Sequence, residues 1–158
     1  MPLRIRPYAG QDLDAIINLF SGTVRQVNCR DYTHEQIEAW APPTVDRERW
    51  RKRLDALRTV VAEIDGTIAG FAAANGQGYL DFLYTHHTFL RRGVASALCE
   101  EIEAGYRAAG VRLVFTHSSI TARPFFQSIG FRVVSERTVQ IGAVSLTNYR
   151  MEKELAGT

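Results

Sequence analysis

The stretch Phe89-Leu90-Arg91-Arg92-Gly93-Val94-Ala95-Ser96-Ala97-Leu98 lies between a strand-like segment and a helix-like one. Two arginines and a glycine stand where the helix would begin. Free backbone N–H groups, the positive end of the helix dipole and two cations would therefore converge on one small volume. This arrangement favours an anionic ligand, although Arg-Arg-Gly before a helix is also common at a merely solvated helix start.

The segments on either side of this turn predict one βαβ unit. Residues 80–85 have the apolar character of a buried strand, and residues 111–117 predict a second strand after Gly110. Apolar residues recur between them at helical spacing, at Val94, Leu98, Ile102 and Tyr106. A strand, a phosphate-type turn, a helix and a strand in this order require parallel strands and a right-handed crossover.

The rest of the chain predicts an α+β fold in which an antiparallel meander joins this unit and a hairpin finishes the sheet. Asp65-Gly66 is a strong hairpin signal. Further strands are expected over residues 3–6, 59–64, 67–73, 131–140 and 144–152, and further helices over residues 13–27, 46–57 and 121–129 and between the capping box at 33–36 and Pro42. Where the meander meets the crossover, adjacent strands are expected to splay beyond Leu83 to Thr85 and to leave backbone groups free for a ligand.

Length and composition indicate one soluble domain over residues 1–158. Apolar residues make up 46% of the chain and charged residues 23%, and the net charge of +2 is too small to argue for a nucleic-acid partner. The longest apolar runs have strand length, so no membrane span is expected. The first residues lack the apolar core of a signal peptide, which makes the cytoplasm the expected compartment.

Two local features have alternative interpretations. Basic residues crowd the segment from Arg47 to Arg58, but Trp50, Leu54 and Leu57 supply an apolar stripe, so a solvated amphipathic helix is favoured over a nucleic-acid surface. Cys29 and Cys99 lack the spacing of a metal site. Both are expected to be reduced and structural, since free cysteine is usually buried, and no metal is expected.

Two motifs carry a resemblance to a known family. Residues 90–95, Leu-Arg-Arg-Gly-Val-Ala, overlay the pattern Gln/Arg-x-x-Gly-x-Gly/Ala. Residues 119–131 overlay the pattern Asn-x-x-Ala-x-x-Phe-Tyr-x-x-x-Gly-Phe. With these two motifs in this order, the chain resembles the GNAT superfamily of acyl-CoA-dependent N-acyltransferases over nearly its whole length. Within this superfamily it resembles a bacterial subgroup of unassigned substrate.

The resemblance implies a fold, a reaction and a set of donor-binding residues. The fold is a mixed, mostly antiparallel central sheet with helices on both faces and a parallel crossover splayed at the CoA site. The reaction moves an acetyl group from acetyl-CoA, a co-substrate, to a primary amine by direct attack, with a backbone amide stabilising the oxyanion. The implied cofactor-binding residues are Leu83, Tyr84, Thr85, Arg91, Arg92, Gly93, Val94, Ala95, Ser96, Ser119, Phe125 and Phe126.

The motif departs from the family pattern at Ser119 and Phe126. Ser119 replaces an asparagine that binds pantetheine, and Phe126 stands where the family often has a tyrosine that protonates the leaving thiolate. Because a thiol has a pKa of about 8.5, thiolate is a tolerable leaving group without that acid. Tyr149 is the preferred substitute acid, ahead of Tyr84, His86 and His87, and a merely packed tyrosine is the alternative.

Asp81 is the predicted base for the acceptor amine, because a carboxylate interrupts an otherwise apolar strand there. Family bases often lie on this strand, on the face expected to be shared by residues 79, 81 and 83. Holding the substrate ammonium or making a structural hydrogen bond are the open alternatives, and Glu63 is the second choice.

The acceptor is expected to be a small-molecule amine, held by the first helices and the closing strands. The residues implied by family topology are Tyr32, Ile37, Trp40, Tyr79 and Tyr149. A protein or peptide amine is an alternative acceptor, and a non-catalytic acyl-CoA-binding module is the alternative from another class. The edge of the closing strands makes a homodimer possible.

Overall fold

Seven strands form one mixed sheet in the computed structural model, which describes residues 2–156. The strands are β1 (Leu3–Pro7), β2 (Arg58–Ile64), β3 (Thr67–Ala74), β4 (Tyr79–Thr85), β5 (Leu113–Ser119), β6 (Arg132–Ile141) and β7 (Val144–Glu154). They lie in the order β1-β2-β3-β4-β5-β7-β6, and every neighbouring pair is antiparallel except β4 and β5. The predicted α+β architecture, with a meander, a parallel crossover and a closing hairpin, is confirmed.

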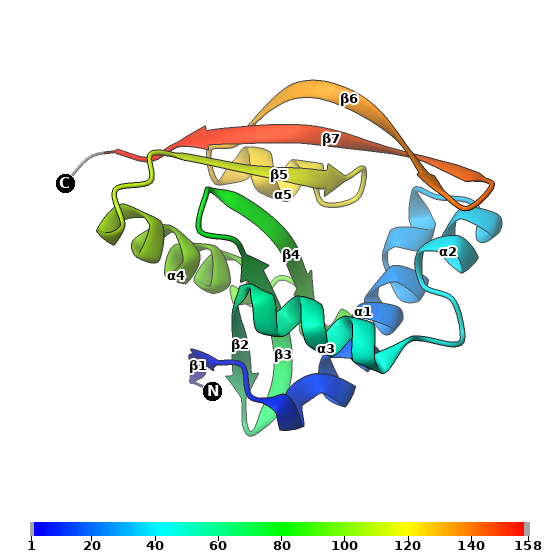
Figure 1. Ribbon diagram of the computed structural model, residues 1–158, viewed down its shortest axis with the longest axis horizontal. Helices are drawn as coiled ribbons and strands as arrows, with labels where there is room; N and C mark the ends of the chain where they lie inside the picture. The colour runs from blue at the N-terminus through cyan, green and yellow to red at the C-terminus, as the bar shows by residue number, and fades with distance from the viewer. Residues whose placement is uncertain (1, 157–158) are drawn as a thin grey trace.

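Helices cover both faces of this sheet (Figure 1). They are α1 (Leu13–Gln26), α2 (His34–Trp40), α3 (Arg47–Ala56), α4 (Val94–Ala108) and α5 (Arg123–Ser128), with 3-10 turns η1 (Gly10–Asp12), η2 (Asn28–Arg30) and η3 (His87–Phe89). A first core lies on the side of α4 and α5 and includes Leu98 and Met151. A second core lies on the side of α1, α2 and α3 and includes Ile16 and Phe71.

Local sequence signals account for several element boundaries. Asp65 and Gly66 both have positive φ, 53° and 76°, as a two-residue hairpin between β2 and β3 requires. The strand predicted from residue 111 begins only at Leu113, because the Val111 N–H donates to the Tyr106 carbonyl and still belongs to the end of α4.

The two halves of the sheet separate along the seam between β4 and β5. These strands pair at Tyr79 with Phe115 and at Leu80 with Thr116, where the Thr116 hydroxyl donates to the Leu80 carbonyl at 2.8 Å. Beyond this point the strands run in different directions, with β1 to β4 on one side and β5, β7 and β6 on the other (Figure 1). The predicted splay is therefore present, at the end of β4 that leads to Thr85.

A bulge at Asp81 changes which face the β4 side chains occupy. Ala73 of β3 pairs with Phe82 and the next residue, Ala74, pairs with Leu80, so Asp81 is the extra residue. Leu83 packs with Leu80 on the first core, whereas Phe82 belongs to the second. The prediction that residues 79, 81 and 83 share one face is wrong, because the bulge interrupts the alternation between Asp81 and Leu83.

The basic segment forms the amphipathic helix α3, as predicted. Leu54 is buried, and Trp50 packs edge-on against Phe20 at 4.9 Å between ring centroids. On the polar side, Arg47 pairs with Asp14 at 2.7 Å. The charges of this helix are thus partly neutralised by carboxylates of the same chain.

The two cysteines differ in environment. Cys99 is buried in α4, and burial raises the pKa of its thiol to about 12. Cys29 is exposed, so the expectation of two buried cysteines is wrong for Cys29, which lies on the surface of η2. Within residues 2–156, no helix combines the length and the apolar character needed to cross a bilayer.

Candidate active site

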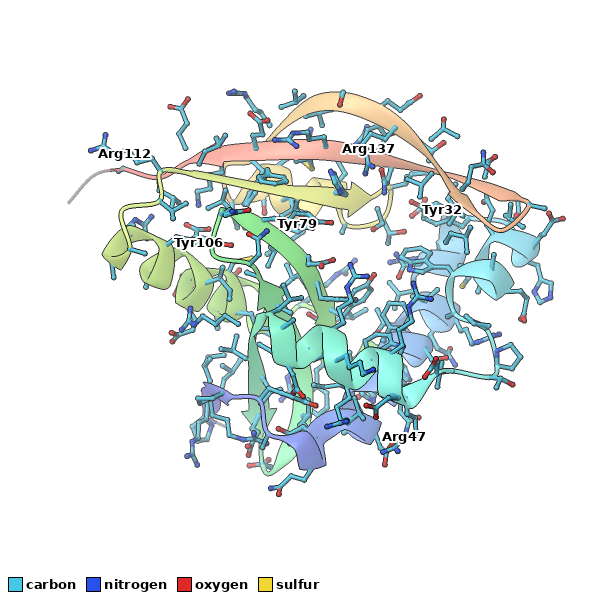
Figure 2. All side chains as sticks on the ribbon, viewed as in Figure 1. Tyr32, Arg47, Tyr79, Tyr106, Arg112 and Arg137 are labelled. Carbon is cyan, nitrogen blue, oxygen red and sulfur yellow. The ribbon has the colours of Figure 1, made fainter. Side chains whose placement is uncertain are left out.

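A cavity of about 760 Å³ opens where β4 and β5 diverge. Its walls come from β4, β5, the start of α4, the α1–α2 region and the β6–β7 hairpin. Figure 2 labels three of its residues, Tyr32, Tyr79 and Arg137, on different sides of this region. Predicted site residues that line the cavity are Asp81, Leu83, Tyr84, Thr85, Arg91, Gly93, Val94, Ala95, Ser96, Ser119, Phe125 and Phe126.

The turn before α4 exposes the first amides of that helix to the cavity. Gly93 is the N-cap residue with φ of 81°, and Arg91 also has positive φ, 61°. No side chain caps the helix, and a Cβ built on Gly93 would meet no atom within 4 Å. The N–H groups of residues 94–96, the helix dipole and the Arg91 guanidinium therefore form an anion-binding concavity.

The two arginines of this turn point in different directions. Arg91 lines the cavity. Arg92 does not, and its guanidinium instead lies over the Phe89 ring at 5.3 Å. The left-handed backbone at Arg91 and Gly93 turns the Arg91 and Arg92 side chains in different directions, although the sequence pattern does not distinguish them.

The outer part of β4 presents its backbone to the gap. The His86 N–H donates to the Ala69 carbonyl of β3 at 2.7 Å. Because strand backbone groups alternate in direction, those of Leu83 and Thr85 face away from β3, and the Thr85 carbonyl accepts from the Thr23 hydroxyl at 2.7 Å. An extended ligand can therefore pair with the Leu83 backbone.

Ser119, Phe125 and Phe126 border the same gap. The Ser119 hydroxyl oxygen accepts from the Ala122 N–H at 3.0 Å and from the Asn28 amide at 3.4 Å. Phe126 is 3% exposed and packs edge-on against Phe131, at 5.1 Å between centroids. This position therefore supplies apolar surface and no proton.

The residues proposed as substitute acids are distributed unevenly around the cavity. Tyr149 does not line it, because Asn148 of β7 faces the cavity and Tyr149 packs on the opposite face, with Arg123 4.7 Å above its ring. Tyr84 does line the cavity, and burial raises the pKa of its hydroxyl far above the ordinary value. His86 and His87 lie outside the lining, stacked on each other at 4.5 Å.

The expected acceptor pocket is assembled in part. Tyr32, Trp40 and Tyr79 line the cavity, whereas Ile37 is buried in the second core. The Tyr32 hydroxyl donates to the Thr147 carbonyl at 2.7 Å and accepts from the Ile120 N–H at 2.9 Å, which ties the helices to the closing hairpin. Glu63, the second candidate base, is paired with Arg6 away from the cavity.

Asp81 lines the cavity with its carboxylate held by α3. The Arg53 Nη2 atom lies 2.8 Å from both carboxylate oxygens, and the Asp81 side chain is 11% exposed. This ion pair fixes the position of the carboxylate and leaves its remaining lone pairs to bind a ligand.

His117 is a titratable cavity residue that sequence reasoning missed. Its Nδ1 lies 3.2 Å from the Tyr79 hydroxyl. Burial, and then the charges of Arg137 and Arg150, lower the pKa of His117, against the opposing effect of Asp81, so the ring is neutral at neutral pH. The signal in the sequence was a histidine at the carboxyl end of a strand predicted beside β4.

The family model of the acetyltransferase (GNAT) domain matches residues 28–154, a span that contains the splayed strands, the turn before α4 and the closing hairpin. The chain belongs to the GNAT acetyltransferase family. The predicted membership and enzyme class are thereby confirmed. Within residues 2–156, no three His, Cys, Asp or Glu side chains are grouped to bind a metal ion.

Other GNAT proteins resemble the chain over nearly its whole length. It is 32% identical over 149 residues, 94% of each protein, to the uncharacterized N-acetyltransferase YafP of Escherichia coli K12. A solved GCN5-related N-acetyltransferase from Rhodopseudomonas palustris is 30% identical, with a TM-score of 0.94 over 98% of this chain and 97% of that one. The PaiA N-acetyltransferase from Thermoplasma acidophilum, solved in complex with coenzyme A, is 20% identical, with a TM-score of 0.79 over 98% and 100%.

Proposed function

We propose that this GNAT enzyme transfers the acetyl group of acetyl-CoA to a primary amine of a small molecule. The observation that carries the proposal is a single cavity that joins the unpaired edge of β4 to the uncapped start of α4. A diphosphate matches the amides of residues 94–96 in charge, and an extended amide-containing arm matches the Leu83 backbone in hydrogen bonding. The complex of the PaiA relative with coenzyme A supports the same donor.

The chain's own residues divide into a donor side and an acceptor side. Arg91 and the α4 amides hold the diphosphate, and the Leu83 backbone orients the arm whose thioester supplies the activated acetyl group. Phe125 and Phe126 keep water from the groove with apolar surface. On the other side, Trp40 and Tyr79 line the space left for the acceptor.

Proton transfer is assigned to the groups around the start of the splay. Asp81 holds the ammonium of the acceptor, one of the roles that the sequence left open, and neutral His117 accepts a proton from it. The amine nitrogen then forms the C–N bond as the thioester C–S bond breaks. Of the two protons that the nitrogen loses, the one accepted by His117 passes on to solvent and the other goes to the leaving sulfur.

The proposal is tested by thiol release from acetyl-CoA with three classes of acceptor: small primary amines, peptides with a free N-terminus, and peptides with a lysine. Small amines are expected to raise the rate well above hydrolysis. Faster turnover of the peptides would instead indicate a protein acceptor. Tight binding of coenzyme A without amine-dependent release would indicate a non-catalytic binding module.

The exposed edge of the closing hairpin supports a homodimer as the assembly. All the residues of β6 from Arg132 to Glu136 are exposed, including the apolar Val133 and Val134. An exposed edge strand offers unpaired backbone groups to a second copy of the chain. The enzyme is also proposed to be cytoplasmic and to form a single domain over residues 1–158.

The rate should depend on pH through His117. Because its pKa is lowered below 6.5, the imidazole is neutral above that pH, and kcat/KM should fall only as the pH drops through the lowered pKa. His117→Gln should abolish this fall in kcat/KM at low pH, the acid limb of the profile. It should also lower kcat by about 10²- to 10⁴-fold, the usual contribution of a general base. The measurement is a pH profile of thiol release.

Asp81→Asn separates the two candidate bases in the same experiment. If Asp81 only holds the ammonium, the variant raises KM for the amine and keeps the acid limb. An unchanged profile in His117→Gln, together with loss of the limb in Asp81→Asn, would assign the base to Asp81 instead.

The two arginines of the turn should differ in their effect on coenzyme A binding. Arg91→Gln should weaken binding by about 10- to 100-fold, since charge-assisted hydrogen bonds contribute roughly 1.5–3 kcal/mol. Arg92→Gln is the matched control and should change the dissociation constant by less than about threefold, because Arg92 lies over Phe89 outside the cavity. Isothermal titration calorimetry measures both, and equal losses would contradict the assignment.

A further inference from the structure

The cavity contains positive charge that the donor site does not use. Its lining includes three arginines, Arg30, Arg91 and Arg137, and one carboxylate, Asp81, which Arg53 already binds. Arg137 belongs to none of the ion pairs formed within residues 2–156. A half-buried guanidinium without a carboxylate favours binding of an anion from outside the chain.

Arg137 is held in place by the closing hairpin. Its Nη1 atom donates to the Asn148 side-chain oxygen at 3.2 Å, and the two residues are direct neighbours across β6 and β7. One hydrogen bond orients the planar group and leaves several N–H donors for a ligand. Val139 and Ile141 follow on β6 at steps of two residues and also line the cavity, so apolar surface continues from the guanidinium.

The position of Arg137 places it with the acceptor-side residues. Its charge acts on His117 and Tyr79, the hydrogen-bonded pair at the start of the splay. Arg91, in contrast, belongs to the turn before α4. The same end of the cavity therefore carries an anion-binding cation and, at Asp81, a carboxylate suited to an ammonium.

We propose that the acceptor is an amine that also carries a carboxylate, an amino-acid-like zwitterion with an apolar body. Its carboxylate binds Arg137, its ammonium binds Asp81, and its apolar part lies against Val139 and Ile141. This inference rests on the proposed acetyl transfer and names its substrate class. A polyamine fits less well, because Arg137 and Arg30 would repel its second charge.

The experiment compares acceptors that differ in a single group. Leucine, phenylalanine and methionine are each assayed beside their α-carboxamides and their decarboxylated amines. The wild-type enzyme should have the highest kcat/KM for the carboxylates. Arg137→Gln should lower that value by about 10- to 100-fold, mainly through KM, and should leave the carboxamides within about twofold at about pH 8, where His117 is neutral with or without the Arg137 charge. Arg137→Lys, which keeps the charge but not the planar fork, should fall between the two.

Arg132→Gln is the matched control on the same strand. Arg132 lies outside the cavity and pairs with Glu152 at 3.6 Å, so the variant should keep the wild-type preference. A melting curve shows that each variant is folded. Equal use of carboxylates and carboxamides by the wild type, or an equal loss for all acceptors in Arg137→Gln, overturns the inference. Absence of amine-dependent thiol release in the wild type overturns the proposed function instead.

Discussion

Gly93→Asp is expected to weaken coenzyme A binding by more than about 100-fold while leaving α4 intact. Aspartate is, with asparagine, one of the few non-glycine residues that adopt the left-handed backbone seen at Gly93, so the helix should form as before. Its carboxylate would lie beside the diphosphate, where two like charges about 5 Å apart repel by roughly 3 kcal/mol at an effective dielectric constant of about 20.

Gly93→Asn is the control for this charge. Asparagine has nearly the same shape and the same tolerance of positive φ, but no charge. Its dissociation constant, measured by calorimetry, should stay within about tenfold of the wild type. Equal losses in the two variants would show that filling the concavity, rather than charge, is what matters.

Gly78→Ala should destabilise the fold by about 3 kcal/mol or more and lower the melting temperature by roughly 6–12 °C. Gly78 has φ of 100°, and a Cβ there would lie 2.3 Å from the Leu113 carbonyl oxygen at the start of β5. The turn at Gly78 and the start of β5 are held this close by the hydrogen bond from the Phe115 N–H to the Gly78 carbonyl, at 2.9 Å. The new methyl group therefore has to push β5 away from β4.

Gly76→Ala tests whether this effect is specific to the close approach. Gly76 lies in the same turn, but a Cβ there would meet no atom within 4 Å. Its unfolding free energy should change by less than about 0.5 kcal/mol, as for an ordinary surface substitution. A calorimetric scan of both variants would contradict the packing argument if their melting temperatures were equal.

Local patterns predicted the features that local physics determines. The helical spacing of Val94 and Leu98 after the glycine turn gave α4, and Asp65-Gly66 gave the hairpin between β2 and β3. In both places a few neighbouring residues set the backbone conformation. The position of the candidate site at the splay followed from the order of these elements.

The parts of the site that sequence reasoning missed depend on residues far apart in the chain. The bulge at Asp81 is defined only by the pairing of β4 with β3, and it places the side chains of Asp81 and Leu83 on different faces of the sheet. The lowered pKa of His117 comes first from its burial and then from the charges of Arg137 and Arg150, which the closing hairpin brings to it. A short motif contains none of this information.

Tyr149 shows how strand alternation limits an inference by residue type. A tyrosine on the closing strand was a reasonable acid by chemistry, but side chains of β7 alternate between the two faces. Asn148 faces the cavity, and Tyr149 consequently packs on the other side, under Arg123. A difference of one residue along β7 therefore decides whether a side chain faces the cavity or packs against the core.

The short seam between β4 and β5 also has a consequence for hydrogen exchange. Backbone pairing across it stops after Leu80 and Thr116, whereas β5 and β7 are paired along the whole length of β5. The β4 amides that face the gap, such as that of Leu83, have no partner strand on that side and should exchange quickly in the free enzyme. A donor bound in the gap would protect these amides from exchange. Solvent access to this edge of β4 therefore depends on whether the active site is occupied.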